Sequence, residues 1–137
     1  MKIYFAASVR GGRELQPVYE EIVKILQGYG EVVNPFLGNE KISDFGETDL
    51  SKEEIHDRDL RMVADCDVLV AELTAPSLGV GYEIAKATTL GKRVVGLFKG
   101  ENTYKLSAMI KGDSGVEVFS YLTVADLKVI LEKVFSK

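Results

Sequence analysis

The sequence contains one cysteine, Cys66, and one histidine, His56, among its 137 residues. A single cysteine forms no disulfide within the chain, which fits a protein of a reducing compartment. A single histidine without a second histidine or a cysteine at ligand spacing gives no metal-site pattern, and we expect His56 on the surface. The sequence therefore excludes a disulfide scaffold, and we expect no bound metal.

Long apolar runs and an excess of basic residues are also missing. No run approaches the roughly 20 residues of a membrane-spanning helix. The first apolar run, which Lys2 interrupts, is too short for a secretory signal peptide, so we expect a cytoplasmic protein. The formal net charge of −4 at pH 7 gives no general attraction to a nucleic-acid backbone. We therefore expect neither a membrane nor a nucleic-acid polymer as partner, and a bound anion must be held by local groups.

Length and composition fit a single domain that spans residues 1–137, because 46% hydrophobic residues suffice for one continuous core. Short apolar runs bounded by turn residues predict five strands, at Lys2–Ala7, Glu31–Asn34, Asp67–Glu72, Arg93–Phe98 and Val116–Phe119. Segments with a helical period lie between and after them, at 14–27, about 51–64, about 78–90, around 106–110 and at 124–135.

Regular alternation of strands and helices predicts an α/β fold, a Rossmann-like or flavodoxin-like three-layer sandwich around a five-stranded parallel sheet. The expected strand order is 2-1-3-4-5. In this order the first and third strands are neighbours whose helices leave to opposite faces, which opens a crevice at their carboxyl ends. The long polar connection at 35–50 is either a binding loop or a flexible excursion.

Two glycine-bearing segments border this expected crevice. The first, 8–14, joins a hydroxyl, two arginines and two adjacent glycines just before a helix, which suits a phosphate. It matches neither the dinucleotide fingerprint nor a Walker loop, and its glycines could be only conformational. The second, 77–83, offers Ser77 as a helix cap and glycines that bring Glu83 close to a ligand. Glu83 could equally be an acid favoured by the helix dipole.

Asp59 lies on the apolar stripe of its helix, with Ile55 and Met62. A carboxyl group on a buried face must be paired, hydrogen-bonded or protonated, so Asp59 is either a general acid or the partner in an ion pair or cap. Together with Glu83 it would form the pair of carboxylates that cleaves glycosidic bonds, here beside a phosphate grip. Three neighbouring charges point away from the stripe, and we expect them to be solvated: Asp57, Arg58 and Arg61.

A family resemblance that spans nearly the whole chain rests on the segments Tyr4–Arg13, Ile55–Leu60, Ala64–Glu83 and Leu106–Gly112. With these segments the chain resembles the 2′-deoxynucleoside 5′-monophosphate N-hydrolases, relatives of the nucleoside 2-deoxyribosyltransferases. It implies hydrolysis of the N-glycosidic bond of a deoxynucleoside monophosphate to a free base and 2-deoxyribose 5-phosphate. It also implies that neither a metal nor an organic cofactor is needed.

The resemblance further implies roles for individual residues. Glu83 would be the nucleophile of a covalent deoxyribosyl-enzyme, Asp59 the acid that assists departure of the base, and Tyr4 would position the nucleophile or the sugar. The substrate and its 5′-phosphate would contact Ala7, Ser8, Val9, Arg10, Gly11, Gly12, Arg13, Ser77 and Gly79. In a homodimer, the neighbouring subunit's site would be completed by Ser107, Ala108 and Met109.

One departure and two alternatives stay open. The mammalian members have a histidine near the base where this chain has Phe36, so base preference is not carried over. A deoxyribosyltransferase would share the glycosyl-enzyme and differ in what attacks it. A catalytically silent nucleotide-binding module would use the glycine segments for binding, with Glu83 only a helix-start acid.

Overall fold

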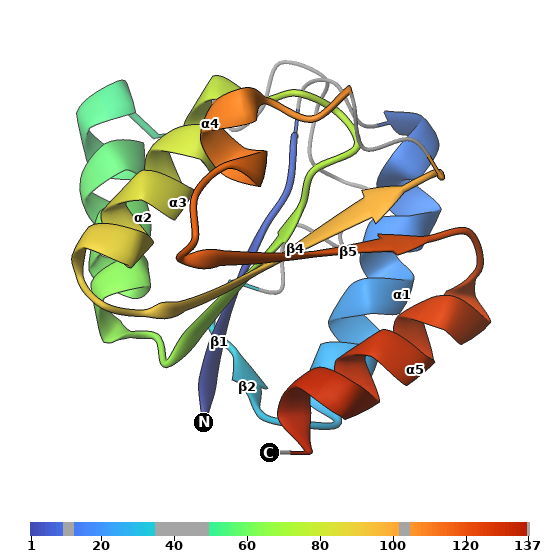
Figure 1. Ribbon diagram of the computed structural model, residues 1–137. Coiled ribbons are helices and arrows are strands. Elements are labelled where there is room, and N and C mark those ends of the chain that lie inside the picture. Colours follow the sequence, from blue (N-terminus) through green and yellow to red (C-terminus); the bar gives the residue numbers. More distant parts are fainter. Residues whose placement is uncertain (10–12, 35–49, 102–104, 137) are drawn as a thin grey trace.

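The computed structural model describes residues 1–9, 13–34, 50–101 and 105–136. Within these ranges five strands alternate with helices (Figure 1). The strands are β1 (Lys2–Ala6), β2 (Glu31–Val32), β3 (Val68–Glu72), β4 (Arg93–Lys99) and β5 (Val116–Tyr121). The helices are the 3₁₀ turn η1 (Arg13–Leu15), α1 (Gln16–Gln27), α2 (Lys52–Asp65), α3 (Leu78–Thr89), α4 (Ala108–Lys111) and α5 (Val124–Phe135).

The strands form one parallel sheet in the order β2-β1-β3-β4-β5, which confirms the predicted fold class and strand order. Strands β1 and β3 pair directly, with Ile3 opposite Val68 and Ala6 opposite Ala71. Their carboxyl ends therefore lie side by side, where the expected crevice was placed. The connection at 35–49 lies outside the described residues.

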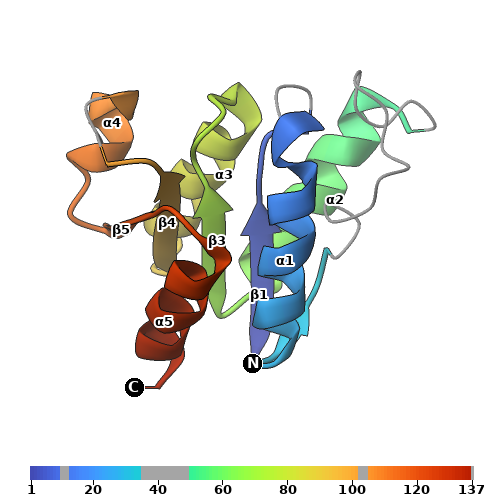
Figure 2. The same cartoon turned by 90° about the vertical axis from the view of Figure 1, so that its right-hand side faces the viewer.

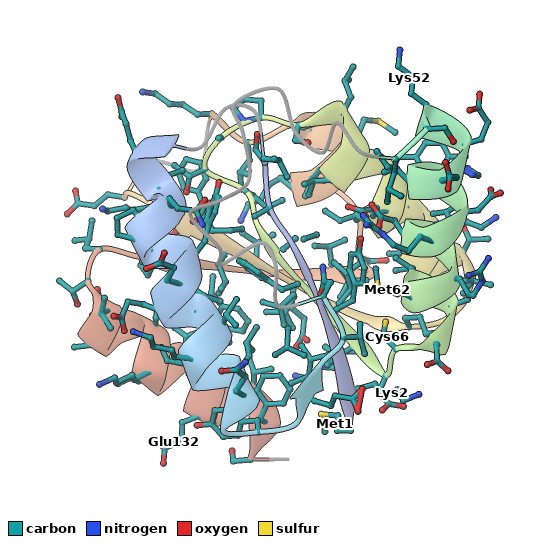
Figure 3. The ribbon with its side chains drawn as sticks, turned by 180° about the vertical axis from the view of Figure 1, so that it is seen from behind. Met1, Lys2, Lys52, Met62, Cys66 and Glu132 are labelled. Atoms are coloured by element: carbon teal, nitrogen blue, oxygen red, sulfur yellow. The ribbon has the colours of Figure 1, made fainter. Side chains whose placement is uncertain are left out.

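The two faces of the sheet carry separate cores. Helices α1 and α5 cover one face, and α2 and α3 cover the other (Figures 1 and 2). Because side chains alternate along a strand, Ile3 and Phe5 of β1 pack with α1 and α5, whereas Tyr4 and Ala6 face α2 and α3. Met62 and Cys66 lie on the side of α2 that faces the sheet (Figure 3). Tyr4 is thus directed toward the helices that carry the two predicted carboxylates.

A buried asparagine extends the pairing of β1 beyond the short strand β2. Asn34 is 0% exposed, and its side chain replaces a strand partner for the backbone of Phe5. The Phe5 amide donates to Asn34 Oδ1 at 2.9 Å, and Asn34 Nδ2 donates to the Phe5 carbonyl at 2.5 Å. This edge of the sheet is therefore satisfied although regular pairing ends at Val32.

Side-chain caps fix where the long helices begin. Ser51 and Glu54 form a capping box at α2, and Thr123 and Asp126 form one at α5. The Ser77 hydroxyl accepts from the Val80 amide at 3.2 Å and starts α3, as predicted. None of the described helices has the length and apolar character needed to cross a membrane.

Candidate active site

A tyrosine of β1 and a glutamate of α3 meet at the carboxyl end of the sheet. Tyr4 is 2% exposed, and its hydroxyl donates a hydrogen bond to Glu83 Oε2. Burial raises the pKa of Tyr4 above its ordinary value, and the negative charges of Glu83 and Asp59 raise it further. The tyrosine therefore stays protonated at neutral pH and acts as a donor to the carboxylate.

The acidity of Glu83 is set by burial and by three neighbours. The pKa of Glu83 is raised from 4.5 to about 7, and burial is the largest cause. This net value already includes the hydrogen bond from Tyr4 and the charge of Arg58, which lower the pKa, and the charge of Asp59, which raises it. Near neutral pH the group thus exchanges between its carboxylate, which is nucleophilic, and its protonated form. A perturbed carboxyl group with a specific hydrogen-bond donor is typical of a functional site.

Asp59 reaches the same cluster from α2, together with an arginine that the sequence placed elsewhere. Arg58 Nε and Nη2 both lie 2.9 Å from Asp59 Oδ1, with side-chain exposures of 29% for Arg58 and 24% for Asp59. The expectation that Arg58 is a solvated charge is wrong. Its side chain is long enough to fold along the helix to its neighbour, although successive helical positions do not face one another.

The other predicted surface charges of α2 are exposed as expected. Asp57 and Arg61 are exposed, and so is His56, whose Nδ1 lies 2.9 Å from Asp57 Oδ1. The imidazole ring also packs edge-on against Tyr82, with 5.9 Å between ring centroids. His56 therefore belongs to the outer surface of α2 and α3.

The start of α3 leaves open space beside its backbone. A Cβ added at Gly79 would meet only the Ser77 hydroxyl, at 3.8 Å, and one at Gly81 would meet nothing within 4 Å. Packing in the described structure therefore does not explain either glycine. The absent side chains keep the first turn of α3 accessible to a ligand.

The first glycine segment is only partly described. Ala7 and Ser8 are buried at the end of β1, and Val9 is half-buried. The predictions for Arg10, Gly11 and Gly12 lie outside the described residues, and Arg13 enters only as the first backbone position of η1. The phosphate grip at this segment thus stays a prediction.

The residues predicted to reach a neighbouring subunit lie on the surface of the single chain. Ser107 caps α4 by accepting from the Met109 amide at 3.2 Å, and Ser107 and Ala108 are exposed. Met109 is 82% exposed. Their accessibility suits a contact with a second copy, and the role itself stays a prediction.

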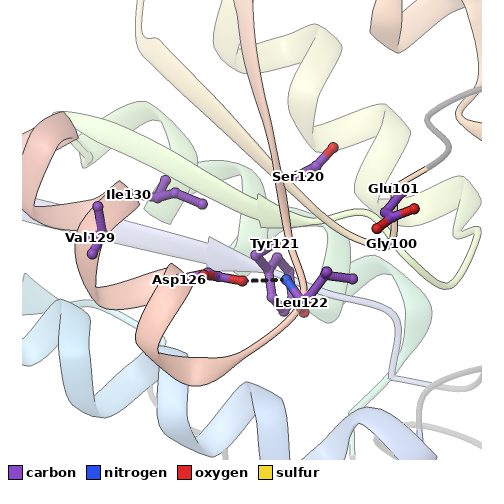
Figure 4. A pocket seen from close by; sticks show the side chains of 8 residues that line it. All are labelled: Gly100, Glu101, Ser120, Tyr121, Leu122, Asp126, Val129 and Ile130. Atoms are coloured by element: carbon purple, nitrogen blue, oxygen red, sulfur yellow. Dashed lines mark hydrogen bonds between the residues drawn. The ribbon is translucent and has the colours of Figure 1, made fainter.

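Two further observations concern metal-type clusters and cavities in the described structure. The described part of the chain contains no group of three or more histidine, cysteine, aspartate or glutamate side chains arranged to hold a metal ion. A cavity of about 380 Å³ lies between the end of β5 and α5, where Asp126 accepts from the Leu122 amide (Figure 4). None of the predicted site residues that the structure describes lines this cavity.

Comparison with known proteins places the chain in a family. The family model for nucleoside 2-deoxyribosyltransferase matches residues 3–128. A zebrafish (Danio rerio) protein named 5-hydroxymethyl-dUMP N-hydrolase is 43% identical over 137 residues, covering 98% of this chain and 96% of that protein. The human (Homo sapiens) protein of the same name is 37% identical over 137 residues, covering 97% of this chain and 78% of that protein.

A solved structure shows the same fold. The CMP N-glycosidase of Clostridium botulinum superposes with a TM-score of 0.71 at 20% identity, covering 98% of this chain and 99% of that one. This likeness supports the α/β fold. The matches to the family model and to the zebrafish relative cover the segments on which the resemblance was based. The chain therefore belongs to the nucleoside 2-deoxyribosyltransferase family.

Proposed function

We propose that this protein hydrolyses the N-glycosidic bond of 2′-deoxynucleoside 5′-monophosphates to a free base and 2-deoxyribose 5-phosphate. The observation that carries the proposal is the contact of Tyr4 with Glu83, beside Asp59, at the carboxyl ends of β1 and β3. The names of the zebrafish and human relatives specify an N-hydrolase of a deoxynucleotide. Chemistry and family thus support the same reaction class.

In the proposed first step, a Glu83 carboxylate oxygen attacks C1′ of the deoxyribose. The C1′–N bond breaks, the electron pair leaves with the base, and protonated Asp59 transfers its proton to the departing base and becomes a carboxylate. Tyr4 binds Oε2 of Glu83, which leaves Oε1 free to attack. A covalent glycosyl-enzyme would result.

In the second step, water attacks C1′ and the bond to Glu83 breaks, which returns the carboxylate and releases 2-deoxyribose 5-phosphate. One proton of that water is transferred to a basic group, for which Asp59 is the candidate in its carboxylate form. A transferase would replace this water with a second base. Incubation of a deoxynucleotide with a different free base separates the two, because a new nucleotide would contradict the hydrolase.

The 5′-phosphate is proposed to lie between segment 8–13 and the first turn of α3. Ser77 and Gly79 supply the exposed amino end of that helix, where backbone amides and the helix dipole favour an anion. We also propose a cytoplasmic location, which a phosphorylated substrate fits. Cell fractionation tests this location.

The protein is proposed to act as a homodimer in which Ser107, Ala108 and Met109 complete the neighbouring site. Three large apolar side chains on α3 and α4 support this arrangement because they are strongly exposed in the single chain: Leu78 (96%), Tyr82 (57%) and Met109 (82%). Light scattering tests this proposal by measuring the molecular mass of the wild type and of Met109→Glu in solution. Val129→Glu, at an exposed apolar position of α5, is the control variant. A monomeric wild type would contradict the proposal.

The decisive assay separates products from deoxy- and ribonucleotides with different bases, including 5-hydroxymethyl-dUMP, and from the matched nucleosides. We expect a free base and 2-deoxyribose 5-phosphate from at least one deoxynucleotide. Glu83→Ala should abolish turnover and retain nucleotide binding. Binding without turnover by wild type would instead favour the silent binding module.

A further inference from the structure

A second buried glutamate lies at the same end of the sheet and takes no part in the proposed chemistry. Glu72 ends β3 and is 0% exposed. Its Oε1 accepts from the Thr74 amide at 2.7 Å, and its Oε2 accepts from the Thr74 hydroxyl at 2.8 Å and from the Tyr121 hydroxyl at 2.5 Å. Burial raises the pKa of Glu72, and these hydrogen bonds lower it.

The carboxyl group is costly at this position. Val68 and Val70, on the same face of β3, belong to the apolar core with α1 and α5. A buried carboxylate is tolerated only when it is fully hydrogen-bonded, and an apolar residue of similar size could stabilise the fold as well. The three donors around Glu72 therefore point to a requirement for accurate placement of the groups that it binds.

These groups connect the ends of several strands. The Thr74 hydroxyl that donates to Glu72 also accepts from the Lys99 amide at 2.9 Å, which ties in the end of β4. Tyr121 is the last residue of β5. Glu72 thus joins the carboxyl ends of β3, β4 and β5 through one carboxyl group.

We propose that Glu72 is a positioning residue for the phosphate end of the substrate. It holds Thr74, in the turn that leads to Ser77 at the start of α3. Tyr4, Asp59 and Glu83 lie with α2 and α3 on the opposite face of the sheet. Glu72 should therefore govern phosphate binding more than bond cleavage. The inference rests on the proposed function, because it takes the deoxynucleotide as substrate.

The test is Glu72→Gln, which keeps the size of the side chain and replaces one acceptor oxygen with a donor. Loss of a hydrogen bond to a charged group should raise KM for the deoxynucleotide about tenfold and leave kcat within about threefold. Binding of 2-deoxyribose 5-phosphate, measured by calorimetry, should weaken to a similar extent, while kcat/KM for the matched nucleoside changes little. An equal loss on nucleotide and nucleoside, or unchanged KM and product binding, would overturn the proposal.

Tyr121→Phe is the second variant, used in case Glu72→Gln fails to fold. It removes one hydrogen-bond donor and leaves the Glu72 carboxyl group in place. We expect a smaller change in the same direction, with thermal melting measured alongside. Glu117→Gln on β5 is the matched control, since Glu117 is exposed and pairs with Arg93 at 2.9 Å. Absence of hydrolysis by wild type would contradict the proposed function, whereas an active wild type with an unaffected Glu72→Gln would contradict only the role of Glu72.

Discussion

Tyr4 and Glu83 are 79 positions apart in the sequence, yet the hydroxyl of one donates a hydrogen bond to the carboxylate of the other. The strand order produces this contact. Because β1 and β3 are neighbours, the helix that follows β3 returns beside the even-numbered face of β1. Tyr4 thereby fixes one oxygen of Glu83 and favours its ionised form.

Replacement of Tyr4 by phenylalanine should slow the enzyme most on the acid side of its pH profile. The lost hydrogen bond raises the pKa of Glu83 above about 7, so a smaller fraction is ionised at neutral pH. We expect kcat/KM at pH 7 to fall about tenfold or more. Tyr29→Phe is the control, because Tyr29 is exposed and stacks on Phe135 away from the site. An unchanged acid limb in Tyr4→Phe would contradict the role of the hydroxyl.

The charge of Arg58 should also determine the pH at which kcat/KM falls on the acid side of the profile. Its guanidinium lowers the pKa of Glu83, so Arg58→Gln should move the acid limb of kcat/KM to higher pH by about one unit, and Arg58→Lys should move it less. Arg61→Gln on the exposed side of α2 serves as control. The pH profiles of the three variants measure the effect, and identical limbs for Arg58→Gln and Arg61→Gln would exclude it.

The sequence determines the fold more fully than the site. Alternating apolar runs and helical periods suffice for the α/β class, and the rules for parallel crossovers then give the strand order that brings Glu83 toward β1. The hydrogen bond from Tyr4 does not follow from this pattern. Alternation indicates only that Tyr4 and Ala6 share a face, and the choice of partner depends on how α3 packs.

Arg58 and Glu72 show why the remaining contacts escape sequence reasoning. Helical periodicity predicts only the direction in which a side chain leaves the helix. The long Arg58 side chain then folds along the helix to Asp59. Glu72 ends a buried apolar run. An acidic residue at the end of such a run is the one feature of the sequence that indicates a buried carboxyl group here. Its donors come from a turn and from β5, which only the three-dimensional arrangement brings together.

The edge of the sheet at β1 should depend on Asn34. Asn34→Ala removes both partners of the buried Phe5 backbone, leaving an amide and a carbonyl without hydrogen bonds. We expect the free energy of unfolding to fall by about 2 to 4 kcal/mol, measured by urea denaturation. Ser114→Ala at an exposed position is the control. A loss below about 0.5 kcal/mol would show that the backbone of Phe5 finds other partners.

Glu83 should destabilise the fold at the pH at which it is active. Its pKa is raised from 4.5 to about 7, so the unfolded chain gives up this proton at lower pH than the folded one. The stability that the protonated group contributes is complete below pH 4.5 and is lost as the pH rises toward and through 7. Glu83→Gln removes this titration and retains an oxygen that accepts from Tyr4. The variant should therefore gain up to about 3 kcal/mol relative to wild type between pH 4.5 and pH 8, as measured by urea unfolding. A stability difference that is independent of pH across this range would mean that Glu83 titrates normally, and the burial that prepares it for nucleophilic attack would then have no energetic effect.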